Sequence, residues 1–210
     1  MAASEPLAPD LYVESVSVDR AAPRYYAFCK RALDLTISAL LLTLFAPLLA
    51  LIALLIRMDS PGPALFIQKR VGRNGELFDI YKFRSMYAGS AKYALSPTTS
   101  HDPRITRIGR LLRRTSLDEL PQLLNVLLGN MSLVGPRPEM PFIVERYNQQ
   151  QRQRLSVIPG VTGLWQISPH RAYPIHQNIE YDLYYIRNRT FMMDIAILVQ
   201  TAFFTMRRGI

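Results

Sequence analysis

The first pattern along the chain is a long apolar run that begins soon after a basic pair. Residues 35–56 contain no charged side chain. At about 1.5 Å of rise per residue, this run would form a helix that crosses a hydrocarbon core of roughly 30 Å. Pro47 falls near the middle of the run, where its ring removes a backbone hydrogen bond and clashes with the carbonyl four residues earlier. The pattern therefore predicts a membrane helix with a break near Phe45 and Ala46.

Both flanks of this run are basic. Lys30 and Arg31 precede it, and the cations that follow it are Arg57, Lys69, Arg70 and Arg73. Because Lys and Arg tend to stay on the cytoplasmic side of a membrane, basic residues at both ends favour a re-entrant hairpin over a simple span. Both arrangements remain open at this point. A buried helix of a soluble protein fits less well, since such helices rarely stay apolar on every side over this length.

The rest of the chain alternates short amphipathic and polar segments. Residues 64–86 form two β-prone stretches around Asn74-Gly75, a step that suits a tight turn, and they predict an antiparallel hairpin. Helical spacing predicts helices over 104–114, 120–128, 139–154 and 191–206. The last of these is apolar with a basic end, so we expect it to lie in a membrane interface. The predicted fold class is mainly α with a small antiparallel hairpin, a Pro-kinked N-terminal helix and interfacial amphipathic helices.

These elements divide the chain into three segments. Residues 1–23 mix Ala, Ser, Pro and isolated charges without periodicity, so we expect a mobile leader there. Residues 24–58 contain the predicted re-entrant helix, and residues 59–210 contain the other elements.

Composition and charge favour anionic partners and exclude several classes of protein. The chain has 25 Lys and Arg against 16 Asp and Glu, a formal net charge of +9 that favours anionic partners such as phosphorylated substrates, anionic lipid or nucleic acid. Its single cysteine excludes an internal disulfide framework, and its three histidines have no zinc-site spacing. Neither a P-loop, a Rossmann fingerprint nor a GxSxG elbow occurs.

The adjacent carboxylates Asp118 and Glu119 are the strongest candidates for catalytic residues. Such a pair at a helix start can act as nucleophile, base or ligand of a hard cation such as Mg²⁺. Ordinary helix capping is the alternative, because Ser116 and Glu119 match a capping box and acidic residues suit a first helical turn. The surrounding arginines favour a phosphate site, since guanidinium groups bind phosphate oxygens.

Several other polar residues are weaker candidates. Arg137 lies between two prolines that fix its backbone, which favours a pre-organised phosphate contact over a plain surface turn. Lys82 and Arg84 alternate along one predicted strand and could contact phosphate, although a basic face with aromatic neighbours also suits nucleic acid. Asp182 is either a further site residue or an exposed helix charge.

Five motifs in order resemble one family. They are residues 30–34 (KRALD), 81–86 (YKFRSM), 116–123 (SLDELPQL), 131–138 (MSLVGPRP) and 159–166 (PGVTGLWQ). Together they resemble the bacterial sugar transferases, the monotopic phosphoglycosyl transferases, in the short form that lacks the additional N-terminal domains of larger relatives. The resemblance extends from about residue 28 to the C-terminus. Residues 168–171 (SPHR) depart from the family pattern in a loop that could touch the sugar or the nucleotide, which leaves the sugar preference open.

The resemblance implies a reaction. A sugar 1-phosphate would pass from a UDP-sugar to undecaprenyl phosphate, giving undecaprenyl diphosphate-sugar and UMP, as the first membrane step of exopolysaccharide, O-antigen or capsule assembly. The enzyme would lie on the cytoplasmic face of the bacterial inner membrane, with residues 59–210 as its catalytic domain. It would contact membrane lipid and no nucleic acid, and the sequence leaves open whether it forms a homo-oligomer.

The resemblance also implies residue roles. Asp118 would be the nucleophile that forms a phosphosugar-aspartyl intermediate, and Glu119 would hold Mg²⁺ or assist proton transfer. Arg113 and Arg137 would steady phosphates, and Pro47 would break the re-entrant helix. The rival interpretation of the whole chain is a membrane-anchored basic module that binds anionic lipid or nucleic acid.

Overall fold

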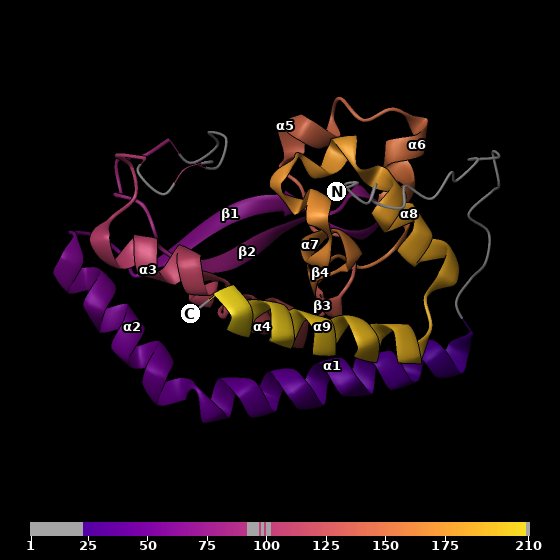
Figure 1. The fold of residues 1–210 in the computed structure, drawn as a ribbon, viewed down its shortest axis with the longest axis horizontal. Helices are drawn as coiled ribbons and strands as arrows, with labels where there is room; N and C mark the ends of the chain where they lie inside the picture. Colours follow the sequence, from indigo (N-terminus) through magenta and orange to yellow (C-terminus); the bar gives the residue numbers. More distant parts are fainter. Residues whose placement is uncertain (1–22, 92–96, 98, 100–101, 209–210) are drawn as a thin grey trace, which may run out of the picture.

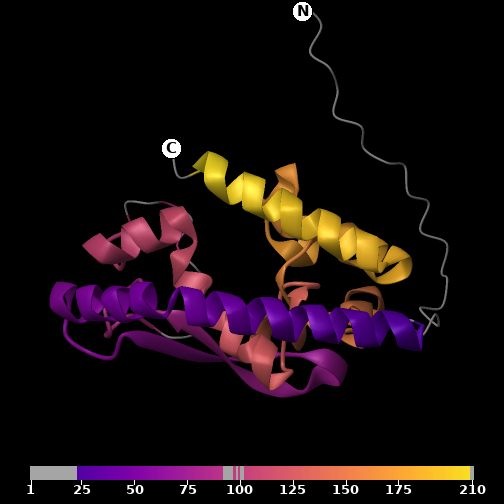
Figure 2. The ribbon, with the colours of Figure 1, turned by 90° about the horizontal axis from the view of Figure 1, so that it is seen from below.

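Two long helices run along one side of the molecule and meet at a sharp bend. The computed structural model describes residues 23–91, 97, 99 and 102–208, so the expected leader lies outside the described residues except for Pro23. Helix α1 (Arg24–Leu44) and helix α2 (Ala46–Asp59) are bent by 62° with Phe45 between them. Figure 1 shows this bend, and Figure 2, seen from the side of these helices, shows the pair crossing the molecule. The predicted break is confirmed.

Pro47 explains the position of the bend. It is the second residue of α2, where a proline costs no hydrogen bond because the first amides of a helix have no helical acceptor. Within the described part of the chain, no single helix is both long and apolar enough to cross a membrane, but α1 and α2 meet that test together as a bent pair. The predicted interruption at Phe45 thus separates two helices rather than kinking one.

Charged side chains of α1 bind the rest of the molecule. Lys30 Nζ lies 2.9 Å from Asp194 Oδ2 on α9 (Phe191–Arg208). Arg31 donates to the last carbonyls of α4 (Gln122–Leu128), and the buried Asp34 carboxylate accepts from the backbone of β3 (Ser132–Val134). The basic pair before the apolar run therefore binds α9 and α4 within the protein, a role that its position beside an apolar run does not predict.

The predicted hairpin is confirmed. Strands β1 (Leu65–Val71) and β2 (Leu77–Phe83) pair antiparallel, with Leu65 opposite Phe83 and Val71 opposite Leu77. A short 3₁₀ turn, η1 (Arg73–Gly75), joins them, and Asn74 takes the left-handed conformation with φ of 57°. Asn is one of the few residues that adopts this conformation at low cost, which is why the turn forms here.

The other elements are short, apart from α9. They are α3 (Arg107–Thr115), η2 (Leu117–Glu119), α5 (Pro141–Val144), α6 (Gln149–Arg152), η3 (Gln153–Ser156), β4 (Gly160–Thr162), α7 (Leu164–Ile167), η4 (Pro169–Ala172), η5 (Ile175–Gln177) and α8 (Ile179–Asn188). The prediction of one helix over 139–154 is wrong in its continuity, because α5 ends at Val144 and a second helical segment, α6 followed directly by η3, begins at Gln149. The helix over 191–206 is confirmed as α9. The mainly α class with a small antiparallel hairpin holds.

A second sheet was not predicted from the sequence. It positions the loop after β3, which carries Arg137. Strands β3 and β4 pair in parallel, with Ser132 opposite Gly160 and Val134 opposite Thr162. The two backbones approach so closely that a Cβ on Gly160 would lie 2.1 Å from the amide nitrogen of Gly135. The main core surrounds this sheet and includes the fully buried Val126 of α4. Burial of these apolar side chains holds α4, the hairpin, α8 and α9 together.

Candidate active site

The carboxylate pair lies in the 3₁₀ turn η2 between α3 and α4. Thr106 caps the start of α3 by accepting from the amide of Gly109, and Ser116 ends that helix in the left-handed conformation with φ of 58°. The Ser116 side chain makes no capping hydrogen bond. The capping-box interpretation is therefore wrong, and the Glu119 carboxylate is directed elsewhere.

Glu119 is held between two cations. Its Oε1 atom lies 2.8 Å from Lys82 Nζ and 2.6 Å from Arg137 Nη2, and its Oε2 atom accepts from Arg137 Nη1 at 3.3 Å. Burial alone would raise the pKa of Glu119, but Arg137 and then Lys82 outweigh burial and lower that pKa below its usual range. Glu119 is therefore ionised at neutral pH. Lys82 comes from β2 and Arg137 from the loop after β3, so the predicted residues meet here from three separate elements.

Asp118 has a different environment. Its carboxylate accepts no hydrogen bond from any described residue, although it is half-buried. Burial and the neighbouring Glu119 raise the pKa of Asp118 to about 6, against the opposing charges of Lys82, Arg113 and Arg137. An ionised carboxylate whose lone pairs are not already used by donors is a stronger nucleophile than one in a salt bridge. The two adjacent carboxylates thus differ in what they can do chemically.

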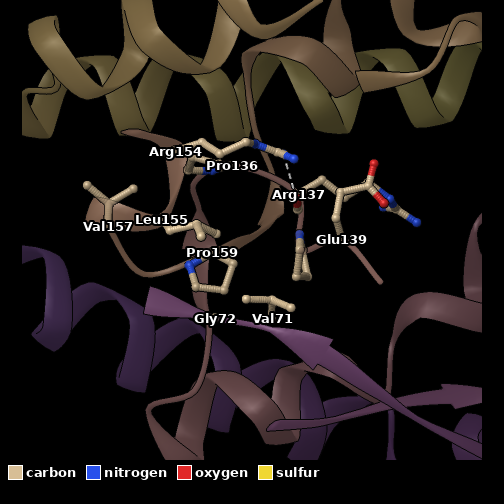
Figure 3. A pocket seen from close by; sticks show the side chains of 10 residues that line it. Val71, Gly72, Pro136, Arg137, Glu139, Arg154, Leu155, Val157 and Pro159 are labelled. Carbon is tan, nitrogen blue, oxygen red and sulfur yellow. Dashed lines mark hydrogen bonds between the residues drawn. The ribbon is translucent and has the colours of Figure 1, made fainter. Parts of the chain in front are cut away.

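The loop that carries Arg137 is fixed through its backbone. Three consecutive carbonyls, those of residues 136, 137 and 138, accept hydrogen bonds from the amide of Gly160, from Arg154 and from Arg70. Figure 3 shows Arg154 reaching the carbonyl of Arg137, at 2.7 Å. With two prolines fixing φ as well, the guanidinium of Arg137 extends from a rigid base.

Asp182 holds Arg154 in place. The two side chains form an ion pair of 2.8 Å, both are almost fully buried, and Tyr147 also hydrogen-bonds Arg154. Asp182 is therefore not an exposed helix charge, and it lies behind the Arg137 loop instead of facing substrate directly. Arg154 itself was missed, because a basic residue in a polar segment carries no signal of burial in the sequence.

Arg84 takes a role other than the predicted phosphate contact. Its guanidinium is buried and donates to the carbonyls of Ile56, Ser60 and Pro61. The last carbonyls of a helix lack helical donors, so Arg84 caps α2 and ties it to the hairpin. Strand β2 ends at Phe83, so Arg84 lies just outside the strand whose alternation grouped it with Lys82.

A cleft of about 1020 Å³ opens beside the carboxylate pair. Its charged lining includes Asp118, Glu119, Arg113 and Lys82, and residues of α1, β4, α7 and α9 line it as well. Apolar side chains from these elements include Leu41, Val161, Leu198 and Phe204. The cleft therefore combines charged and apolar side chains within one continuous space.

The carboxylate pair supplies oxygens of the kind that a magnesium ion prefers. Among the described residues, no group of three or more His, Cys, Asp or Glu side chains could hold a metal ion alone. Mg²⁺ is usually bound by only one or two carboxylates, with water and substrate phosphates completing its coordination. Among the residues that the structure describes, no donor occupies the Asp118 oxygens, and Glu119 Oε2 accepts only the longer bond from Arg137, so these oxygens would face such an ion.

Comparison with known proteins identifies the family of the chain. The profile described as "Bacterial sugar transferase" matches residues 25–208. The chain is 41% identical over 202 residues to an undecaprenyl-phosphate galactose phosphotransferase of Salmonella typhimurium, covering 89% of this chain and 42% of that protein. It is 46% identical over 193 residues to an undecaprenyl-phosphate glucose phosphotransferase of Komagataeibacter xylinus, covering 86% of this chain and 36% of that one.

A relative of similar length also matches. The chain is 43% identical over 192 residues to the exopolysaccharide production protein PSS of Rhizobium leguminosarum bv. phaseoli, covering 86% of this chain and 96% of that protein. By contrast, the chain spans only about two fifths of the Salmonella relative. The profile match nevertheless includes both carboxylates, the Arg137 loop and the bent helix pair, and the chain belongs to the bacterial sugar transferase family.

Proposed function

We propose that this chain transfers a sugar 1-phosphate from a UDP-sugar to undecaprenyl phosphate, releasing UMP and forming undecaprenyl diphosphate-sugar. The single observation that carries the proposal is the contrast between the two carboxylates. Asp118 faces the cleft without a hydrogen bond from a described residue, whereas Glu119 is clamped by Lys82 and Arg137. The names of the Salmonella and Komagataeibacter relatives support a polyprenyl phosphate acceptor.

In the proposed first step, Asp118 Oδ attacks the β-phosphorus of the UDP-sugar. The new Oδ–P bond forms as the bridging P–O bond breaks, and UMP leaves with the bridging oxygen. In the second step, a phosphate oxygen of the acceptor attacks the same phosphorus and releases Asp118. Arg137 and Arg113 would stabilise phosphate charge in both steps, since fixed cations act most strongly where charge develops. Glu119 would keep Lys82 and Arg137 in position.

A magnesium ion would serve this site as a Lewis acid that reduces repulsion between the Asp118 carboxylate and the anionic donor. Asp118 would hold it, with Glu119 Oε2 as the second protein oxygen. A covalent intermediate would also let the water-soluble UDP-sugar and the lipid acceptor react one after the other, because the two need not be bound together.

The proposed location is the cytoplasmic face of the bacterial inner membrane, with α1 and α2 as a re-entrant hairpin and α9 in the interface. The bend of 62° supports a hairpin over a straight span. The apolar side chains that line the cleft, among them Leu41 of α1, would hold the chain of the acceptor while its phosphate lies near Asp118.

The test is UMP release in lipid nanodiscs from a panel of UDP-sugars. We expect release from one or more donors to require undecaprenyl phosphate and Mg²⁺ for repeated turnover, and to be lost in Asp118→Asn. A binding module would release no UMP, and its affinity for anionic lipid would survive Asp118→Asn and fall steeply with salt. Release that persists in Asp118→Asn would contradict the proposed nucleophile.

A further inference from the structure

Arg70 is a residue of β1 that lines the same cleft as the carboxylate pair. Phe66, Gln68 and Arg70 alternate along this strand and all line the cleft, as does Lys82 on the paired strand. The Arg70 side chain is only 13% exposed. The preceding residue, Lys69, points to the other face of the hairpin, where it is 49% exposed. In the sequence Arg70 was only one of several cations after the apolar run.

The guanidinium of Arg70 has fewer acceptors than its donors can use. Nη1 donates to the carbonyl of Pro138 at 3.3 Å, and the nearest carboxylate oxygen, Glu139 Oε2, lies 3.9 Å away. Nε is buried and has no hydrogen-bond partner among the described residues. Burial, together with the like charge of Arg137, lowers the pKa of Arg70 to about 10, so the group remains charged at neutral pH. A buried cation with so few partners is costly unless an anion joins it.

The local charges favour a phosphate as that anion. Lys82 and Arg137 already bind Glu119, and the carboxylate within ion-pair distance of Arg70 among the described residues is Glu139, at 3.9 Å. Arg70 is therefore a third cation beside a carboxylate that two cations already bind, and its own ion pair with Glu139 is long. A planar guanidinium can bind two phosphate oxygens at once, which a lysine cannot do.

We propose that Arg70 binds a phosphate group of a substrate in the cleft, next to Arg137. This inference rests on the proposed function and extends its phosphate-binding set by one residue. The phosphate could belong to the nucleotide-sugar donor or to the lipid acceptor, since both carry the same chemistry. The two half-reactions distinguish these sources.

The test compares Arg70→Gln and Arg70→Lys with Lys69→Gln, which removes the same charge from the opposite face of the same strand. Single-turnover UMP release without acceptor measures the donor half-reaction, and transfer from the preformed intermediate measures the acceptor half-reaction. We expect Arg70→Gln to raise the KM of the substrate that supplies the phosphate by about 10- to 100-fold, the range for loss of a hydrogen bond to a charged group. Arg70→Lys should recover part of this loss, and Lys69→Gln should match wild type.

Three results would overturn the inference. The first is a folded Arg70→Gln with both KM values within twofold of wild type. The second is an equal fall of kcat in both half-reactions at unchanged KM, which indicates that Arg70 only supports the Arg137 loop. The third is an equal loss in Lys69→Gln. If Arg70→Gln does not fold, Arg70→Lys decides, because loss of the bidentate contact predicts at least a threefold rise in one KM. Absence of UMP release in wild type would instead refute the proposed function.

Discussion

Replacing Arg154 with methionine separates the stability of the site from its activity. In Arg154→Met, the Asp182 carboxylate loses its partner while staying almost fully buried. Breaking a buried ion pair by removing one partner costs about 3–5 kcal/mol of the free energy of unfolding. The double variant Arg154→Met/Asp182→Leu removes the unpaired charge, so most of that stability should return.

Activity should not return with stability. In both variants the Arg137 carbonyl loses the donor that lies 2.7 Å away, and the Arg137 side chain loses part of its rigid base. A displacement of about 1 Å in a positioning residue can cost about 100-fold in rate, so we expect UMP release to fall at least about tenfold in the single and the double variant. Arg152→Met, which alters an exposed neighbour, is the matched control.

The free energy of unfolding should also depend more strongly on pH in Arg154→Met than in the wild type. Burial raises the pKa of Asp182 to about 6 even with Arg154 opposing it, and removal of Arg154 raises that pKa further. A carboxyl whose folded-state pKa exceeds its unfolded value, about 4, stabilises the folded state when protonated. The variant should therefore lose stability as pH rises from about 4 through 6 and above. Urea unfolding in detergent at several pH values, paired with UMP release, measures both effects. Full activity in the double variant, or unchanged stability in the single one, would refute this account.

Three further predictions concern packing, topology and metal. Gly109→Ala should lower the unfolding temperature markedly, because its Cβ would lie 2.0 Å from the carbonyl oxygen of Ser85, and a melt like that of wild type would contradict this packing. Cysteines placed at Arg24 and Lys69 in a Cys29→Ser background should react with the same impermeant reagent on the cytoplasmic side, whereas opposite labelling would contradict the re-entrant arrangement. Chelation of divalent ions should abolish UMP release and added Mg²⁺ should restore it, and full activity in excess EDTA would refute the magnesium role.

The sequence predicted those parts of the fold that depend on local chemistry. Pro47 breaks the helix regardless of how α1 and α2 pack against the rest of the protein. Asn74 adopts the left-handed conformation of the hairpin turn at low cost. The grouping of Asp118 and Glu119 with Arg137 was also predicted, because the motif resemblance linked residues that are distant in the chain.

What could not be predicted depends on long-range packing. The parallel pair β3–β4 has only three residues in each strand, too few to produce an alternation pattern. Arg84 was assigned to phosphate, although the carbonyls of Ser60 and Pro61, just after α2, that accept from it become its neighbours only in the folded chain. Similarly, the burial of Asp182 depends on Arg154, which lies 28 residues earlier.

The most direct measurement is the mass of the chain after reaction with a UDP-sugar and Mg²⁺ in the absence of acceptor. The account predicts one UMP released per active chain, a mass increase of one phosphosugar on the peptide that contains Asp118, and loss of the adduct when undecaprenyl phosphate is added. A protein that turns over with acceptor but never carries the adduct, or that carries it on another residue, would contradict the assignment of Asp118 as the nucleophile.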